Sequence, residues 1–380
     1  GNVIDHRSKE LIEVYETDET MRQVLDLAMA LEGQPRNTSK HAAGVVICRE
    51  PLSDHVPLQK NGDDVTTQYN MTQVEKLGLL KMDFLGLRTL TDIHKAIQLV
   101  KKTTGIELDF SKETYSDPNI YELISNGDTE AVFQLESSGM KKTMMDLKPT
   151  CLEDIIAGIA LFRPGPMNEI PRFIDGKYHP ENVQYDHPML RSILEVTYGC
   201  MVYQEQVMQI VQKMAGFSMG RADMVRRAMG HKDPAEMARQ REVFIHGEVA
   251  EDGTVLVDGC VRRGIPEETG TLIFDKMEKF AEYAFNKSHA TVYAVVAYQT
   301  AYLKRYHIVE YLAAVLNNRI TNSDEIKKYV GYCVSHDIKV LPPSVNQSEV
   351  DFSVQNGNII YGLAGIKNVG LNIVGNIVEE

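Results

Sequence analysis

The sequence of 380 residues predicts an α+β fold, with a small mixed β portion followed by a large, mostly α-helical region. Two observations carry this prediction. Stretches with the character of β-strands are confined to residues 42–85. From about residue 87, apolar side chains recur every three or four positions, as they do in helices. The hydrophobic content of 43% suffices for sizeable cores, and the length is typical of two or three domains.

The first predicted element is a helix over residues 9–32. Apolar residues from Leu11 to Leu31 recur at helical spacing, and Gly33 and Pro35 then end the pattern. We expect one continuous helix ahead of the β-rich stretch.

Three strands are predicted next, over residues 42–48, 65–71 and 79–85, with a turn at Asn61-Gly62 between the first two. We expect the third strand to lie next to the first. After it the sequence is almost wholly helical, with turn signals at the following places: Asp117-Pro118, residues 163–166, Asp252-Gly253 and Pro342-Pro343.

The third strand, in "LLKMDFLGLRTL", holds one carboxylate, Asp83, within an apolar run. Asp83 follows Lys81 by two places. Side chains alternate between the faces of a strand. Leu80, Met82 and Phe84 are therefore expected to face a core, while Lys81 and Asp83 project together from the other face. Such a strand end suits phosphate or metal chemistry, although a surface ion pair would explain the same pattern.

A basic helix is predicted in "SMGRADMVRRAMGHK", with Ser218 as its N-cap. Arg226 and Arg227 are candidates for phosphate binding, because guanidinium groups bind phosphate through two hydrogen bonds. The alternative is a solvated helix face, in which Asp223 and Arg227 form an i,i+4 pair worth only about 0.3–0.5 kcal/mol.

A second candidate anion site lies in "FNKSHATVYAVVAYQTAYLKRY". Ser288 is the predicted cap of a helix that begins at His289, and Lys287 lies beside that end. Helix N-termini favour anions, so a triphosphate or pyrophosphate could bind here. His289 and Tyr293 share one face of the helix. The alternative is a capped helix with an incidental histidine.

Two loops are the remaining candidate functional sites. "FRPGPM" predicts a rigid loop with Arg163 at its edge, although many such loops are only turns. "GIKNVG" resembles the glycine hairpin of a helix-hairpin-helix, in which backbone N–H groups meet DNA phosphates. Its residues Gly365, Lys367 and Gly370 are the candidates for DNA binding.

Composition excludes several classes of protein. The net charge of −13 argues against a general nucleic-acid coat protein, which needs an excess of Lys and Arg. Five cysteines without a C-x-x-C motif argue against a disulfide framework or a zinc ribbon. No apolar run is long enough to span a membrane, and the start is not a signal peptide. The sequence contains no P-loop, no G-x-S-x-G and no H-E-x-x-H.

Taken together and in this order, the motifs resemble one family, the α subunit of bacterial DNA polymerase III, a replicative polymerase of the C family. The matching stretches cover nearly the whole chain: "SKHAAGVVI", "KMDFLGLRTLTDI", "AVFQLESSGMKK", "ALFRPGP", "YGCMVYQEQVMQI", "ADMVRRAMGHK", "EKFAEYAFNKSHATVYAVVAYQTAYLK" and "YGLAGIKNVG". The resemblance implies a division into a helical tail of the thumb (1–35), a partial palm (36–90), the fingers (91–355) and the start of a helix-hairpin-helix region (356–380).

The resemblance also implies an activity, the template-directed addition of deoxynucleotides to a primer 3′ end with release of pyrophosphate. Its implied partners are primer-template DNA, deoxynucleoside triphosphates and other replicase subunits such as the sliding clamp, in the cytoplasm and without a membrane. Asp83 matches the family's third catalytic carboxylate, which helps to bind two Mg²⁺ ions. The implied nucleotide-binding residues are Lys81, beside Asp83, and four residues of the fingers that we expect to converge on one concave surface: Arg226, Arg227, Lys287 and His289.

One departure of the sequence from the family concerns the palm aspartates. The family's other two palm aspartates lie upstream in an Asp-x-Asp motif, and no Asp-x-Asp occurs here. We therefore expect a fragment that is catalytically incomplete by itself, binds little or no Mg²⁺ at Asp83, and lacks the regions for clamp contact. Two alternatives remain, a nucleic-acid-binding module without catalysis and a metal-dependent phosphohydrolase built around Asp83.

Overall fold

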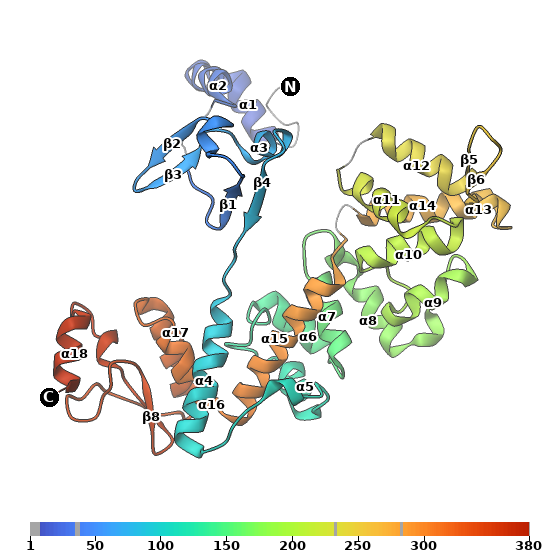
Figure 1. The fold of residues 1–380 in the computed structure, drawn as a ribbon. Helices are drawn as coiled ribbons and strands as arrows, with labels where there is room; N and C mark the ends of the chain where they lie inside the picture. Colours follow the sequence, from blue (N-terminus) through green and yellow to red (C-terminus); the bar gives the residue numbers. More distant parts are fainter. Residues whose placement is uncertain (1–7, 35–38, 232–233, 282–283, 380) are drawn as a thin grey trace. The chain divides into compact units, whose positions relative to one another are not determined.

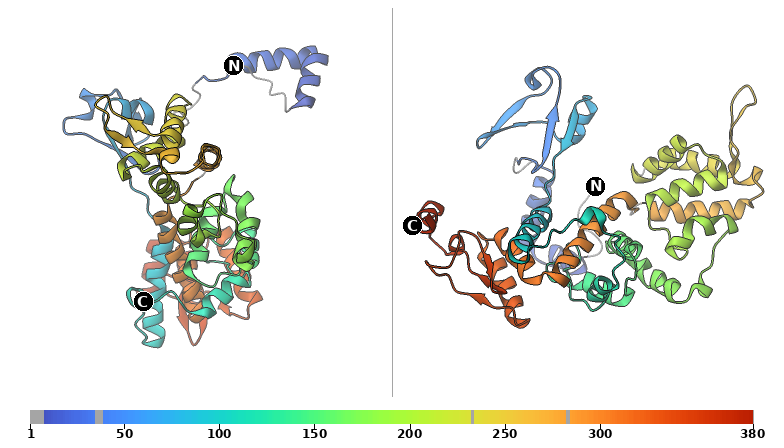
Figure 2. Two further views of the ribbon diagram at one scale, coloured as in Figure 1. Left: turned by 90° about the vertical axis from the view of Figure 1, so that its right-hand side faces the viewer. Right: turned by 60° about the horizontal axis from the view of Figure 1, so that its bottom comes forward.

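The computed structural model describes residues 8–34, 39–231, 234–281 and 284–379. The chain divides into two compact units, residues 1–86 and residues 87–380 (Figure 1 and Figure 2). The first unit holds short helices and strands, and the second is mostly helical, so the predicted α+β fold class is confirmed.

The first unit begins with two helices where the sequence predicts one. Helix α1 spans Lys9–Thr17 and helix α2 spans Glu19–Leu31. Asp18 separates them, because its backbone is extended and its carboxylate accepts hydrogen bonds from the N–H groups of Thr20 and Met21. A side chain that caps a new helix ends the old one, and the periodicity of apolar residues does not record such a break. Pro35 lies outside the described residues.

The strands of the first unit form two antiparallel pairs. Strand β1 (Gly44–Ile47) pairs with β4 (Leu80–Asp83), as the sequence predicts. Strand β2 (Leu58–Asn61) forms a hairpin with β3 (Asp64–Thr67) across the predicted turn. The strand predicted over 65–71 is therefore shorter, because Asn70 caps helix α3 (Met71–Lys76) with a capping box.

The apolar face of β4 was predicted wrongly. Leu80, Met82 and Phe84 are 57%, 42% and 62% exposed, so they face no core in the described residues. Alternation along a strand determines which residues share a face, but burial also requires another layer to cover that face. In the described part of the first unit, β1 and β4 form a sheet of two strands.

The second unit contains helices of very different lengths, and 3-10 turns connect several of them. Its α-helices are α4 (Arg88–Thr104), α5 (Pro118–Ser125), α6 (Ser138–Leu147), α7 (Leu152–Leu161), α8 (Ile170–Tyr178), α9 (Arg191–Leu194), α10 (Gln204–Ala215), α11 (Met219–His231), α12 (Pro234–His246), α13 (Gly259–Arg262), α14 (Glu267–Ala281), α15 (Lys287–Tyr306), α16 (Ile308–Asn317), α17 (Ser323–Ser335) and α18 (Leu371–Glu379).

The sequence patterns missed short strands in this unit. Strands β5 (Glu248–Val249) and β6 (Val255–Val257) flank the turn predicted at Asp252-Gly253. A later sheet has the order β7-β9-β8, formed by Val340–Leu341, Asn358–Ile360 and Ser353–Gln355. Strands of two or three residues are too short to establish an alternation pattern.

Three clusters of buried side chains hold the second unit together. The first core joins α5, α6 and α7 to one face of α15. In the second core, the helices from α9 through α14 pack against one another. The third core joins α4, α16 and α17 to the sheet β7-β9-β8.

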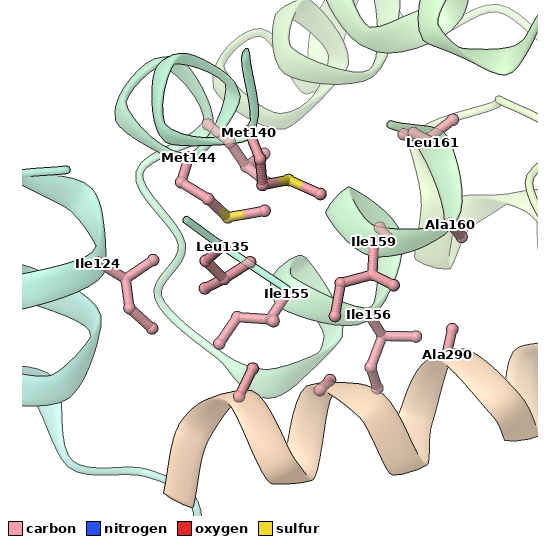
Figure 3. Close-up of a cluster of buried hydrophobic side chains, with 14 of the residues drawn as sticks. Ile124, Leu135, Met140, Met144, Ile155, Ile156, Ile159, Ala160, Leu161 and Ala290 are labelled. Atoms are coloured by element: carbon pink, nitrogen blue, oxygen red, sulfur yellow. The ribbon is translucent and has the colours of Figure 1, made fainter. Parts of the chain in front are cut away.

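Small side chains let α15 pack closely against α7 in the first core. Ala290, Ala294, Ala297 and Ala301 recur at helical spacing and are fully buried. Figure 3 shows Ile155 and Ile156 of α7 pointing toward this helix. Because Leu303 and Val296 of α15 belong to the third core, this one helix connects two cores.

Candidate active site

Lys81 and Asp83 project from the same face of β4, as alternation predicts. Lys81 Nζ donates a hydrogen bond to Asp83 Oδ1 at 2.6 Å. The side chain of Lys81 is 13% exposed and that of Asp83 is 44% exposed, so the carboxylate is the more accessible of the two. This hydrogen bond lowers the pKa of Asp83 below its ordinary value of 3.8, and the charge of Lys81 acts in the same direction.

Two neighbours of Asp83 were not among the predicted site residues. Gly44 of β1 is paired with Asp83, and a Cβ atom on Gly44 would lie 2.8 Å from Cε of Lys81 and 3.0 Å from Asp83 Oδ1. His41 Nδ1 lies 3.7 Å from Asp83 Oδ1 and accepts hydrogen bonds from the N–H groups of Ala43 and Gly44. A glycine within a strand pattern is the sequence signal that could have indicated this close approach.

The groups around Asp83 do not by themselves fit a Mg²⁺ site. Mg²⁺ requires several oxygen ligands in octahedral geometry. Asp83 is instead bonded to an ammonium group and lies beside an imidazole nitrogen. Within residues 8–34, 39–231, 234–281 and 284–379, no group of three or more His, Cys, Asp or Glu side chains could hold a metal ion.

Arg226 and Arg227 both bind the carboxylate of Asp223 on helix α11. Arg226 Nε donates to Oδ1 at 2.9 Å, and Arg227 Nε donates to Oδ2 at 2.8 Å. These bonds hold the pKa of Asp223 below its ordinary value, with the Arg226 bond as the largest cause. Ser218 Oγ accepts a hydrogen bond from the N–H of Arg221, as expected of the predicted N-cap. The surface ion pair that the sequence offered as the alternative is thus present.

Helix α15 begins two residues earlier than predicted. Its cap is Asn286, whose Oδ1 accepts a hydrogen bond from the N–H of His289 at 2.9 Å, and Lys287 is its first residue. The predicted cap Ser288 lies within the first turn. Both Asn and Ser are good caps, so the sequence alone could not rank them.

A carboxylate already lies at the N-terminus of α15. Glu205 of α10 accepts hydrogen bonds from the N–H of Lys287 to Oε1 at 3.1 Å and to Oε2 at 3.0 Å. The position where the sequence suggested a phosphate is therefore partly filled by an internal anion, as the favourable field at helix N-termini predicts.

His289 lines a cavity of about 600 Å³ with aromatic walls. Its ring lies 4.1 Å from that of Tyr293 and 5.2 Å from that of Phe285, measured between centroids. The guanidinium carbon of Arg163 lies 4.0 Å from the Phe285 centroid, so the predicted rigid loop brings Arg163 into this cavity. Phe133 contributes a further aromatic ring.

The predicted nucleotide-binding residues are only partly brought together. The lining of the His289 cavity does not include Lys287, Arg226 or Arg227. In the described part of the chain, no hydrogen bond or ion pair links the two arginines to Lys287 or His289. The arginines lie on a helix of the second core, whereas His289 lies on a helix of the first. Their convergence on one concave surface remains a prediction.

Near the end of the chain, residues 361–370 form a tight turn ahead of α18. Gly365 ends a 3-10 turn (Leu363–Gly365), and its carbonyl accepts a hydrogen bond from Tyr361 Oη at 3.2 Å. Lys367 is exposed, and the carbonyl of Gly370 accepts the N–H groups that begin α18. The predicted hairpin is thus a turn with one exposed lysine.

Among the described residues, no helix is both long enough and apolar enough to cross a membrane.

Three family profiles match the chain in sequence order. The profile described as the bacterial DNA polymerase III alpha NTPase domain matches residues 2–86. The finger domain of the same subunit matches residues 89–252, and a helix-hairpin-helix motif matches residues 337–380. These descriptions name neither a palm nor a thumb, so those divisions of the chain stay predictions.

Curated relatives are similar to almost the whole chain. DNA polymerase III subunit alpha of Thermus aquaticus is 48% identical over 371 residues, which cover 96% of this chain and 29% of that protein. The proteins of the same name from Bacillus subtilis and Escherichia coli K12 are 45% and 42% identical. Their alignments cover 94% and 97% of this chain, and 31% and 32% of those proteins. The chain therefore spans about a third of the length of the relatives it matches.

Proposed function

The chain belongs to the family of bacterial DNA polymerase III alpha subunits, and we propose that it contributes to template-directed DNA synthesis within a longer protein. The reaction is the addition of a deoxynucleotide to a primer 3′ end, with release of pyrophosphate, in the bacterial cytoplasm. The observation that carries the proposal is the 42–48% identity to polymerase subunits over nearly the whole chain. The pairing of Lys81 and Asp83 on one strand face supports it.

In this proposal Asp83 supplies one carboxylate to a divalent metal site, and Lys81 orients that carboxylate and faces the phosphates. When bound, Mg²⁺ supplies charge neutralisation and alignment of the reacting oxygens. The described residues around Asp83 do not fit the ion alone, so further oxygen ligands must come from elsewhere. We therefore expect this chain by itself not to extend a primer.

The fingers residues Arg226, Arg227, Lys287 and His289 are proposed to bind the triphosphate of the incoming nucleotide. Asp223 already holds the Nε groups of both arginines, and Nη2 of Arg226 lies 2.8 Å from its Oδ1, so a phosphate must bind the remaining N–H groups or displace the carboxylate. The cavity beside His289 has the aromatic walls and the guanidinium group on which a nucleobase can stack.

The proposed DNA contacts of the turn before α18 are Gly365, Lys367 and Gly370. With a net charge of −13, binding of this chain to duplex DNA should be weak and steeply dependent on salt. Contacts with other replicase subunits, such as a sliding clamp, are assigned to regions outside this chain.

The test of the proposal is Asp83→Asn in a full-length protein that contains this region. Primer extension should fall by orders of magnitude, because a metal ligand is lost and no packing is. Thermal unfolding should change little, since the Asp83 side chain is 44% exposed and an asparagine oxygen can still accept the hydrogen bond of Lys81. Asp54→Asn, at an exposed aspartate of the same unit, is the matched control and should retain activity.

Primer extension, DNA binding and phosphate release together separate the proposal from the two alternatives, a nucleic-acid-binding module and a metal-dependent phosphohydrolase. Near wild-type extension by the Asp83→Asn variant would reject the assignment of Asp83. DNA binding without extension by the full-length protein would favour a binding module. Mg²⁺-dependent release of phosphate from nucleotides without extension would favour a phosphohydrolase.

A further inference from the structure

We infer that Glu205 is a positioning residue of the candidate active site, because its carboxylate fixes the first turn of α15, which carries Lys287 and His289. Its effect on nucleotide binding rests on the proposed function. The connection itself rests on the hydrogen bonds between two helix ends that lie about eighty residues apart in the sequence.

The carboxylate of Glu205 binds both the backbone and the cap of α15. Both of its oxygens accept the N–H of Lys287, at 3.0 and 3.1 Å. Oε1 also accepts Nδ2 of Asn286 at 2.9 Å. The other end of that amide, Oδ1 of Asn286, accepts the N–H of His289. Glu205 thus orients the amide that holds the backbone of His289.

The backbone on either side of this carboxylate is also joined. The N–H of Gln204 donates to the carbonyl of Phe285 at 2.9 Å, and Gln204 Nε2 donates to the carbonyl of Ala284 at 3.2 Å. Tyr203 and Phe285 form a parallel bridge. The ammonium group of Lys287 lies 5.3 Å from the ring centroid of Tyr203. The segment that leads into α15, from Ala284 to Lys287, is therefore held by the segment that opens α10.

The opening segment of α10 is itself anchored in the protein interior. Oε1 of the buried Gln206 accepts the N–H groups of Val202 and Tyr203 at 2.8 and 3.0 Å, and its Nε2 donates to Thr197 Oγ1 at 2.8 Å. Because Tyr203 belongs to the first core, Glu205 projects from a fixed platform. A carboxylate on a fixed platform can set the position of the turn that it binds.

This arrangement also determines what the end of α15 can still offer an anion. The N–H of Lys287 binds Glu205, and that of His289 binds Asn286. Among described residues, Ser288 has no partner for its N–H, and this residue is exposed. A phosphate that approaches α15 therefore meets the Ser288 N–H and the side chains of the first turn, rather than a free helix end.

The functional test is steady-state kinetics in a full-length protein that contains this region. Glu205→Ala should raise KM for deoxynucleotides about tenfold and change kcat by less than about threefold, because misplacement of binding groups weakens substrate binding. The dissociation constant for primer-template DNA should not change. Glu205→Gln should restore most of the loss, because an amide oxygen still accepts the N–H of Lys287.

A second pair of variants tests the connection through the cap. Asn286→Asp keeps an oxygen for the N–H of His289 but places a second carboxylate against Glu205, so KM should rise as in Glu205→Ala. Combining it with Glu205→Gln restores a donor and an acceptor between the two positions and should rescue KM. Glu195→Ala is the matched control, because Glu195 is exposed and its closest ion-pair contact is 4.0 Å from Arg191.

Hydrogen exchange separates failure of this inference from failure of the proposed function. If His289→Ala leaves the nucleotide KM unchanged, the nucleotide site is wrong. The connection is then judged by exchange of the Lys287 and His289 amides, which should be faster in Glu205→Ala and near wild type in the double variant. Unchanged exchange in Glu205→Ala, or a double variant as impaired as Asn286→Asp, would overturn the role of Glu205.

Discussion

The two units of the chain hold their candidate site residues in different ways. In the described part of residues 1–86, Val56 and Val74 are the buried side chains, and Lys81 and Asp83 stand on a sheet of two strands. In residues 87–380, His289 stands on a helix that packs into the first core.

This difference shows that alternation along a strand and burial in a core fix the residues of a site by separate means. Alternation along β4 is enough to bring Lys81 Nζ to 2.6 Å from Asp83 Oδ1, because residues i and i+2 of one strand project from the same face. A sheet of two strands is only marginally stable without further packing. The helix that carries His289 is instead held by packing from Ala290 to Leu303, in the first and third cores.

The largest expected effect is on packing in the first core. Ile155→Ala should lower the free energy of unfolding of the second unit by about 2–5 kcal/mol, because the fully buried side chain leaves a cavity. Met82→Ala on the exposed face of β4 should change stability by less than about 0.5 kcal/mol. Urea unfolding, monitored in each unit by hydrogen exchange, measures the stability change of both variants. Equal losses from the two variants would show that the apolar face of β4 is covered in solution.

The next effect concerns a buried charge. The Lys304 side chain is fully buried, and its Nζ donates to Asp128 Oδ1 at 2.7 Å and to the carbonyls of Asp128 and Glu130 at 2.9 Å. Burial lowers the pKa of Lys304. Lys304→Met should destabilise the second unit by about 1–3 kcal/mol, because buried carbonyl oxygens lose their donor.

The matched control for Lys304 is Lys327→Met, because Lys327 is exposed and its pair with Asp324 is 3.5 Å long. It should change the urea midpoint of unfolding by an amount that corresponds to less than about 0.5 kcal/mol. A Lys304→Met variant as stable as this control would mean that the buried bonds contribute nothing net.

The smallest expected effect is on the titration of Asp83. The Lys81 hydrogen bond lowers the folded-state pKa, so its contribution to stability is present above pH 3.8 and is lost as pH falls through the folded-state pKa. Lys81→Met should move the pKa of Asp83 upward, toward its ordinary value. Carboxyl carbon NMR across acidic pH measures the shift, and an unchanged midpoint would indicate that the bond does not persist in solution.

The sequence predicted contacts between residues that are close in sequence and missed several contacts between residues that are far apart in sequence. The alternation that places Lys81 and Asp83 on one face of β4, and the i,i+4 approach of His289 to Tyr293, follow from periodicity and are present. The cap of α15, Asn286, donates a hydrogen bond to Glu205, and periodicity cannot place Glu205 beside residue 286.

Burial was hard to predict for the same reason. The apolar residues of β4 alternate as core residues do, but no described layer covers them. The break at Asp18 is a different case, since an aspartate between two apolar patterns is a local capping signal that the prediction overlooked.

The place of α15 in the chain sets the order in which the cores can be completed during synthesis. Helices α5, α6 and α7 leave the ribosome before the alanine face that covers them, and Ala301 follows Leu161 by about 140 residues, or about 7–28 s at the usual rate of translation. The second core, from Leu190 to Met277, emerges within that interval. Helical domains fold within milliseconds, so this later part of the chain can finish folding first. The face of α7 that packs against α15 meanwhile remains uncovered on the nascent chain, where its apolar side chains can associate with other chains.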